Sequence, residues 1–287
     1  MSDFLVQTSL RPSHRAGVLA AAAIALTSAF PSAQARPSRH VLFIGNSYTA
    51  ANNLAEVVAG IAEARQAGPV IVPSMALRGG QMLDWHLHYG PAMPALDGPA
   101  HDITDVVLQE QSTLGAGDAL DDASGGQHLT IADPAEFYAG VRGLVKRIRA
   151  RGATPVLFMT WARRDWPEDL EKLQKAYVAI GRELNVKVAP VGVAWAEAQR
   201  RIPTLVMYVA DGSHPSWAGS YLAACVLYAT ITGQDPRGAP PLISGHFVDR
   251  RSGEIDRSEV ITLVNLEPEL AAELQTIAWE TVSGRRW

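Results

Sequence analysis

The sequence predicts an α/β fold, a three-layer α/β/α sandwich around a mostly parallel five-stranded sheet. Short apolar runs alternate along the chain with longer amphipathic segments, and this order is typical of parallel strands joined by helices. Right-handed crossovers then place helices on both faces of the sheet. The chain has 287 residues, of which 47% are hydrophobic and 19% are charged. It is therefore long enough and apolar enough for one domain with a buried core.

Five short apolar runs are the expected strands. The first ends at Gly45, and the third is bounded by Asp105 and Gln109. The runs cover residues 40–44, 70–73, 106–108, 154–160 and 186–191. In open parallel sheets, binding and catalytic residues gather where the strands end. The candidates for chemistry are therefore the residues that follow the strands, namely Ser47, residues 79–80, residues 109–112 and Trp161.

The amphipathic segments are the expected helices. The best marked one begins at Asp133 and Pro134, with Glu136 completing a start that resembles a capping box, and it ends at Gly152. Further helices are expected over residues 54–64 and after Pro167, Ser216 and Pro268. Residues 115–130 are rich in Gly, Asp and Ser and show no periodicity, so we expect a long loop or lid there.

The first 35 residues differ in composition from the rest of the chain. Arg11, His14 and Arg15 precede an apolar run over residues 16–26, and Ala33-Gln34-Ala35 closes the segment. A basic start, a short apolar middle and an A-x-A end are typical of a secretory signal peptide. The run is too short and too rich in Ala for a stable membrane anchor. We expect residues 1–35 to be a bacterial signal peptide and residues 36–287 to be one secreted or periplasmic catalytic domain. A buried N-terminal helix is the alternative.

Charge and cysteine content exclude several other classes. The net charge is −4 and the basic residues are scattered, so the sequence favours neither nucleic acid nor an anionic membrane surface as a partner. Cys225 is the only cysteine and lies in an apolar run, where it is expected to behave as a small core residue. The core alone must hold the fold, because one thiol forms no intramolecular disulfide.

Ser47 is the candidate nucleophile. It follows Gly45-Asn46 directly after the first expected strand. A serine at a strand-to-helix turn is exposed at the edge of the sheet, and its backbone N–H can stabilise a developing oxyanion. Taken alone, Gly-Asn-Ser is also ordinary turn chemistry.

Asp211 and His214 are the candidate activating pair, in the only Asp-x-x-His of the chain. A serine hydroxyl needs a base that works near neutral pH, which histidine supplies, and the histidine needs a carboxylate that fixes its tautomer. An Asp three residues before the His can reach it within one turn of chain. Taken alone, the segment can also be a surface turn in which His214 is incidental.

Together, these blocks resemble the SGNH (GDSL-like) hydrolase superfamily of esterases and lipases. In that superfamily the nucleophilic Ser follows the first strand, as in Phe43-Ile44-Gly45-Asn46-Ser47 here, and the last block carries Asp-x-x-His, as in residues 211–214. The resemblance spans roughly residues 39 to 232 and includes the order of the blocks. It implies a flavodoxin-like sandwich and a Ser47–His214–Asp211 triad. The absence of Gly-x-Ser-x-Gly argues against the α/β-hydrolase fold.

The resemblance also implies an oxyanion hole. Its expected donors are the N–H groups of Ser47 and Gly80, with Gly79 as the alternative glycine, and a side-chain amide. The family's third block usually supplies that amide from an Asn, whereas this sequence has Gln109-Glu110-Gln111. Gln111 is the expected donor and Gln109 the runner-up, while Glu110 is expected to point away and to suit a buried or helix-capping role. The first block also differs from the usual pattern of the family, because it has Asn46 at the position where Asp is common.

Weaker patterns suggest other sites. Asp84, His86, His88 and His101 could be metal ligands, but no HExxH helix or Cys cluster supports them. Trp residues near expected loops could line a sugar or acyl pocket, although such side chains are more often packing; they are Trp85, Trp161, Trp166 and Trp217. The pair Arg163-Arg164 is expected to lie in a loop that is exposed to solvent.

The function expected from this site is hydrolysis of a small-molecule or carbohydrate ester through an acyl-enzyme. His214 takes the Ser47 proton, Ser47 attacks the ester carbonyl and Asp211 steadies the imidazolium. The mechanism requires neither a metal nor an organic cofactor. Acyl transfer or thioester cleavage by the same triad is one alternative. A secreted binding module that has lost activity is another, which the joint presence of Ser, Asp and His disfavours.

Overall fold

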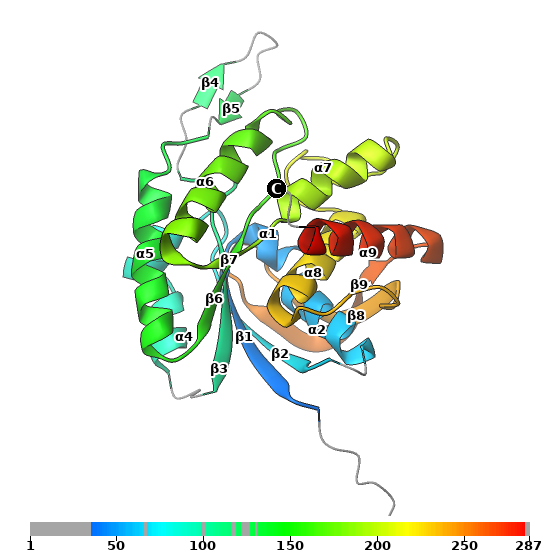
Figure 1. The fold of residues 1–287 in the computed structure, drawn as a ribbon, viewed down its shortest axis with the longest axis horizontal. Coiled ribbons are helices and arrows are strands. Elements are labelled where there is room, and N and C mark those ends of the chain that lie inside the picture. Colours follow the sequence, from blue (N-terminus) through cyan, green and yellow to red (C-terminus); the bar gives the residue numbers. More distant parts are fainter. Residues whose placement is uncertain are drawn as a thin grey trace, which may run out of the picture. The chain divides into compact units, whose positions relative to one another are not determined.

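Five parallel strands form the central sheet in the computed structural model (Figure 1). The structure describes residues 36–65, 68–98, 102–115, 119–121, 127–129 and 131–284. The strands are β1 (Ser38–Gly45), β2 (Val70–Leu77), β3 (Ile103–Gln109), β6 (Thr154–Phe158) and β7 (Lys187–Ala189). They lie in the order β2-β1-β3-β6-β7, and each neighbouring pair is parallel. The predicted fold class is confirmed.

Alternate residues of β1, which lies between β2 and β3, face two separate apolar cores. Val41 and Phe43 belong to one core, whereas Leu42 and Ile44 belong to the other, and all four are at most 1% exposed. Successive side chains of a strand point to opposite faces, so an unbroken apolar run fits a sheet that is covered on both sides. The sheet is thus the middle layer of the sandwich.

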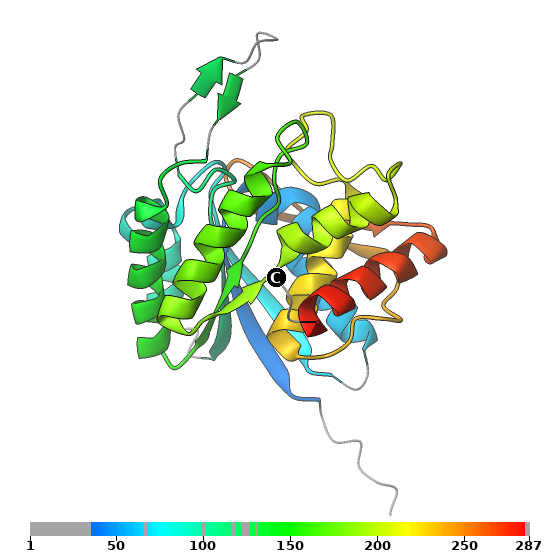
Figure 2. The same ribbon diagram turned by 45° about the horizontal axis from the view of Figure 1, so that its top comes forward.

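Helices cover both faces of this sheet, as the two views of Figure 1 and Figure 2 show. On one face lie α2 (Leu54–Ala64), α7 (Val191–Arg201), α8 (Trp217–Thr232) and α9 (Pro268–Ser283). On the other lie α3 (Leu83–His88), α4 (Ala92–Asp97), α5 (Ala135–Ala150) and α6 (Asp169–Leu184). Helix α8 is buried around nearly its whole circumference, Cys225 included, because helices and the sheet enclose it.

Local capping explains where several helices begin and end. The Ser216 side chain accepts a hydrogen bond from Gly219 N, 3.2 Å away, and so caps α8. Asp133 accepts from Ala135 N at 2.9 Å at the start of α5, and Gly152 follows that helix with φ +77°. Several boundaries differ from expectation; for example, β2 extends to Leu77 and β6 ends at Phe158. Helix α6 begins at Asp169, two residues after Pro167, and β7 is limited to Lys187–Ala189.

Two antiparallel hairpins complete the described chain. One pairs β4 (Ala119–Asp121) with β5 (Gln127–Leu129), so part of the segment expected to be a loop or lid is hydrogen-bonded strand. Residues 116–118, 122–126 and 130 of that segment lie outside the described residues. The other hairpin, β8 (Leu242–Val248) and β9 (Ile255–Asn265), was not anticipated. It packs against α2 and a short 3-10 helix, η1 (Ala51–Asn53).

The expected signal peptide, residues 1–35, lies outside the described residues. Within the described ranges, no helix combines the length and the apolar character that crossing a membrane requires.

Candidate active site

The turn after β1 carries Ser47. It is the first residue of the short helix α1 (Ser47–Ala50), and Asn46 caps that helix by accepting a hydrogen bond from Tyr48 N at 3.2 Å. Gly45 is the last residue of the strand, and a side chain there has no room, since a Cβ on Gly45 would lie 2.6 Å from the side-chain oxygen of Gln109. The strand and the cap together fix the position of Ser47 at the carboxyl edge of the sheet.

The structure brings Ser47, His214 and Asp211 together. The Nε2 atom of His214 lies 2.8 Å from Ser47 Oγ, and its Nδ1 atom lies 2.7 Å from Asp211 Oδ2. A carboxylate only accepts, so His214 carries its proton on Nδ1 and accepts the Ser47 hydroxyl proton on Nε2. The imidazole is therefore in the tautomer that a general base needs.

The same short turn fixes the Asp211 carboxylate. Its Oδ1 atom accepts hydrogen bonds from the backbone N–H groups of Ser213 and His214, each at 2.9 Å. Partial burial favours a higher pKa for Asp211, but these two N–H groups and the His214 ring outweigh it and hold the pKa below the usual Asp value. Asp211 thus stays ionised beside His214 near neutral pH.

Aromatic side chains hold the His214 loop against the Ser47 helix. Tyr48 stacks on Trp161 with ring centroids 4.6 Å apart, and its hydroxyl lies 2.7 Å from Ser213 Oγ. Trp161 donates from its indole N–H to Ser213 O at 3.0 Å. The Tyr48 ring also meets His214 edge-on at 5.4 Å. Trp161 was expected near the site, but it is buried and acts as a support for the loop rather than as an open pocket wall.

The side chain of Gln109, the runner-up oxyanion donor, already forms hydrogen bonds with other residues of the protein. Its Oε1 atom accepts from Asn46 N at 3.0 Å and from Thr49 Oγ1 at 2.9 Å. Its Nε2 group donates to Asn46 Oδ1 at 3.0 Å and to Glu110 O. The side chain is fully buried. Gln109 therefore fastens β3 to the Ser47 turn and has no N–H left for a substrate.

Ser47 and Gly80 each present a free backbone N–H. Among the described residues, neither N–H has a hydrogen-bond acceptor. Gly80 lies in the loop after β2 with φ +72°, and Asn46 Nδ2 donates to Gln81 O at 3.0 Å, which ties this loop to the nucleophile turn. Gly79 is the poorer alternative, because its N–H already donates to Arg251 O at 3.0 Å.

The Gln111 amide has a fixed orientation. Its oxygen accepts from Thr113 N at 2.5 Å and from Thr113 Oγ1 at 2.6 Å. A backbone N–H can only donate, so the atom facing it is the oxygen, and the NH₂ group points away from Thr113. No acceptor for that NH₂ is found within the described part of the chain. Gln111 can donate to a ligand where Gln109 cannot.

Solved structures with the same fold place the chain in a family. A protein from Slackia heliotrinireducens, provisionally described as an SGNH hydrolase, matches with 26% identity and a TM-score of 0.52, over 68% of this chain and 99% of its own. The chain belongs to the SGNH hydrolase superfamily. No family model and no curated protein matches it, so this SGNH hydrolase is a divergent member.

Two further structures share the fold at lower identity. A DUF4886 family protein from Bacteroides uniformis matches with 16% identity and a TM-score of 0.61, over 86% of this chain and 95% of its own. An acetyl-xylooligosaccharide esterase from Geobacillus matches with 17% identity and a TM-score of 0.50, over 69% of this chain and 95% of its own. The fold of this SGNH hydrolase is thus one on which ester hydrolases are built.

Glu110 links the two loops of the candidate oxyanion hole. Its buried carboxyl accepts from Gln111 N at 2.6 Å and from Leu83 N, the first residue of α3, at 3.1 Å. It thereby caps α3 and is fully buried, which matches the buried or helix-capping role that the sequence suggested. Burial, only partly offset by these two hydrogen bonds, raises the pKa of Glu110 to about 8. At neutral pH this SGNH hydrolase therefore carries a protonated carboxyl beside Gln111.

His86 supports the nucleophile turn rather than a metal. Its Nε2–H donates to Gly45 O at 2.8 Å, and burial lowers the pKa of His86 to about 4, so the ring is neutral. His88 lies 3.5 Å from Asp84 on the same helix. In the described ranges, no group of three or more His, Cys, Asp or Glu side chains is arranged to hold a metal ion, and His101 lies outside them.

Arg163 was expected to lie in a solvated loop, but in the structure it is partly buried and hydrogen-bonded. Its Nη2 group donates to Ser112 Oγ at 3.0 Å, and the residue is half-buried. Arg164, in contrast, is exposed and paired with Asp165 at 3.0 Å. The Arg163 contact joins the loops after β3 and β6 beside the site of this SGNH hydrolase. No local sequence pattern could reveal it, because the partners are distant in the chain.

Proposed function

We propose that this SGNH hydrolase cleaves small acyl esters with Ser47 as nucleophile, His214 as general base and Asp211 as its partner. The observation that carries the proposal is the unbroken hydrogen-bond chain from Ser47 Oγ through the His214 ring to Asp211, with distances of 2.8 and 2.7 Å. These distances lie within the reach that a nucleophile and its base require. Proteins that share this fold include hydrolases that act on esters, and this likeness supports the same class of reaction.

The reaction runs through two tetrahedral intermediates. His214 Nε2 takes the hydroxyl proton as Ser47 Oγ bonds to the ester carbonyl carbon. The protonated ring then gives that proton to the departing alcohol oxygen, which leaves an acyl-Ser47 ester. A water molecule loses a proton to His214, attacks the acyl carbon and releases the acid, and Ser47 regains its proton. The ionised Asp211 stabilises the imidazolium in both halves.

Three donors are proposed to hold the oxyanion. The N–H groups of Ser47 and Gly80 are free to bind a carbonyl oxygen that becomes negative, and the Gln111 NH₂ group is the third candidate. Such donors act most strongly when they are already oriented before the reaction. The Asn46–Gln81 and Gln111–Thr113 hydrogen bonds supply that orientation.

Acetyl esters, including acetylated carbohydrates, are the first substrates to test, since one structural neighbour is described as an acetyl-xylooligosaccharide esterase. The experiment compares chromogenic esters of increasing acyl length, with and without an acceptor sugar, on the wild type, Ser47→Ala and the surface control Ser258→Ala. We expect turnover in the wild type and in Ser258→Ala, and a loss of several orders of magnitude in Ser47→Ala. Acylated acceptor sugar as the main product would instead indicate a transferase.

We also propose that the protein is exported and cleaved after Ala35. The basic start, the apolar run and Ala33-Gln34-Ala35 support this, and the rest of the chain supplies the hydrolase domain. Expression of the full chain in a Gram-negative host, fractionation and N-terminal sequencing test it. A start at Arg36 in exported protein is expected, whereas exported protein that retains Met1 would rule out cleavage.

A further inference from the structure

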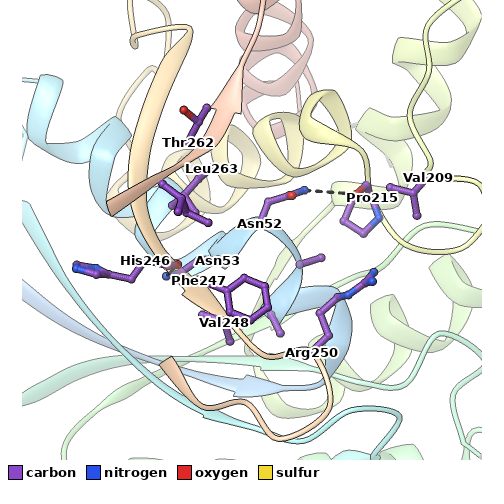
Figure 3. A pocket seen from close by; sticks show the side chains of 13 residues that line it. Asn52, Asn53, Val209, Pro215, His246, Phe247, Val248, Arg250, Thr262 and Leu263 are labelled. Carbon is purple, nitrogen blue, oxygen red and sulfur yellow. Dashed lines mark hydrogen bonds between the residues drawn. The ribbon is translucent and has the colours of Figure 1, made fainter. Parts of the chain in front are cut away.

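A pocket of about 290 Å³ lies between η1, the β8–β9 hairpin and the loop that precedes His214 (Figure 3). Its floor is the turn after α1, where Asn52 and Asn53 have φ of +53° and +44°. Asn is the residue type that best tolerates this left-handed conformation after Gly. The volume is near the lower end of the range typical of small-molecule sites, roughly 300–1,000 Å³.

Two residues of the pocket wall and the hairpin that carries the pocket are linked to the candidate active site. Ala50, in its wall, ends the helix that Ser47 begins. Val209, also in the wall, donates from its N–H to His214 O at 3.0 Å. The hairpin turn supports the Gly80 loop, because Arg251 O accepts from Gly79 N at 3.0 Å. A substrate whose ester lies at Ser47 can therefore extend into this pocket.

Most polar groups in the pocket are already bonded. The Asn52 NH₂ donates to Ser220 Oγ at 2.8 Å, and Asn53 accepts from Glu56 N at 3.3 Å and donates to His246 O at 2.9 Å. His246 is paired through Nδ1 with Glu56 at 3.1 Å. These groups shape the pocket but have little capacity left for a ligand.

Arg250 is the exception. Within the described residues, its guanidinium has no hydrogen bond and no ion pair. The neighbouring acid, Asp249, is turned into the hairpin turn, where it accepts from Arg251 N and Ser252 N. Figure 3 shows the Arg250 side chain rising from the hairpin toward Val209 and Pro215. A positive charge with five unused N–H donors thus faces a pocket beside the nucleophile.

An apolar wall stands beside this charge. Phe247 is 52% exposed and Val209 is 39% exposed, although both are large apolar residues, and both line the same pocket. A planar ligand portion could cover these side chains while its charged end meets Arg250. Ligand sites commonly combine an apolar surface with one or two charged groups in this way.

We propose that this pocket binds the alcohol portion of an anionic ester, with Arg250 pairing a carboxylate on that portion and Phe247 packing against its apolar face. The inference rests on the proposed ester hydrolysis at Ser47 and adds the class of substrate. A guanidinium fork matches the two oxygens of a carboxylate, and such charge-assisted pairs are stronger than neutral hydrogen bonds. Substrates with a carboxylate beyond the ester are therefore preferred over their neutral analogues.

The test uses two acetate esters, 3-acetoxybenzoate and methyl 3-acetoxybenzoate, which differ in charge and by one methyl group. The measured quantity is the ratio of kcat/KM for the charged ester to that for the neutral one. We expect this ratio to fall about tenfold in Arg250→Ala, less in Arg250→Lys, and not at all in Arg257→Ala, a control on the exposed face of the same hairpin. Added salt should weaken the wild-type preference. A ratio that stays at the wild-type value in Arg250→Ala overturns the proposal.

A binding measurement keeps this result separate from the proposed catalysis. Titration of 3-acetoxybenzoate into Ser47→Ala, and into Ser47→Ala with Arg250→Ala, measures the Kd for the pocket in the absence of turnover. We expect a Kd about tenfold higher for the double variant. If the wild type hydrolyses neither ester, the proposed function fails, and the two Kd values still decide on the pocket. Equal Kd values in the two variants contradict the role of Arg250.

Discussion

Asn46 and Gln109 bind each other through two hydrogen bonds of 3.0 Å each, one from Asn46 N to Gln109 Oε1 and one from Gln109 Nε2 to Asn46 Oδ1. The pair joins the carboxyl ends of β1 and β3 directly before the candidate nucleophile. Both side chains are buried, so the loss of either leaves polar groups without partners. The position of Ser47 therefore depends on a residue more than sixty positions away.

Gln109→Leu should lower stability and activity together. The change leaves Asn46 N and Thr49 Oγ1 without their partner, whereas Asn46 Oδ1 keeps the hydrogen bond from Tyr48 N. Each buried polar group left unpaired costs about 1–3 kcal/mol. Thermal unfolding and kcat on an acetyl ester measure the two effects. Retention of the wild-type Tm with Gln109→Leu would contradict the structural role.

Gln111→Ala should lower activity while the fold remains stable. If its NH₂ group meets the oxyanion, kcat should fall by roughly 10²–10³, as the removal of one such donor does elsewhere. KM should change little, because the bond strengthens only in the transition state. The alternative is that Gln111 only orders its loop through Thr113; in that case Tm falls and kcat stays near the wild-type value.

Asp211→Asn should reduce kcat on the order of 10²–10⁴, because an amide can hold the imidazole in the wrong tautomer. His214→Ala should cost several orders of magnitude, and Ser47→Ala with His214→Ala should be little worse than either single change. Steady-state kinetics on one acetyl ester measure all four variants. Multiplicative losses in the double variant would show that Ser47 and His214 do not act as one unit.

Glu110 should give the folded protein a pH-dependent stability. Its pKa rises from an ordinary value of 4.5 to about 8 on folding, so between these values the folded state holds a proton that the unfolded state lacks. Stability contributed by this group is therefore complete below pH 4.5 and is lost as pH rises toward 8. The pKa of His86 falls from 6.5 to about 4 on folding, so the stability that depends on this group rises with pH between these values. Above pH 6.5 His86 no longer changes the stability.

Between pH 6.5 and 8 the pH dependence of stability from Glu110 is separated from that of His86. Denaturant unfolding of the wild type should lose up to about 1.4 kcal/mol per pH unit in this window. Glu110→Gln has nearly the same shape but cannot ionise, so its unfolding free energy should be flat there. The same slope in both proteins would show that another group is responsible.

The sequence was sufficient to predict the layers of the fold, because they follow from local patterns. Residues 41–44 form an unbroken apolar run, and such a run fits a strand with a core on each side. The Ser47 turn and the Asp211-to-His214 block were also visible, since each lies within a few residues of chain. Their mutual approach was implied only by the resemblance to a known family.

What the sequence did not predict depends on contacts between distant residues. The bond of Trp161 to Ser213 O and the raised pKa of Glu110 arise from packing that no local pattern encodes. The β8–β9 hairpin is different, because Ser252-Gly253 between two runs rich in β-branched residues is a recognisable turn signal. That signal could have located the wall of the pocket that holds Arg250.

Covalent labelling shows whether Ser47 is the activated nucleophile. The protein is treated with a fluorophosphonate, which reacts with activated serines, and the modified residue is located by mass spectrometry of the peptides. We predict one adduct, on Ser47, that is absent from His214→Ala because the unassisted hydroxyl is unreactive. An adduct on a different residue, or no adduct in a preparation that hydrolyses esters, would show that Ser47 is not the nucleophile.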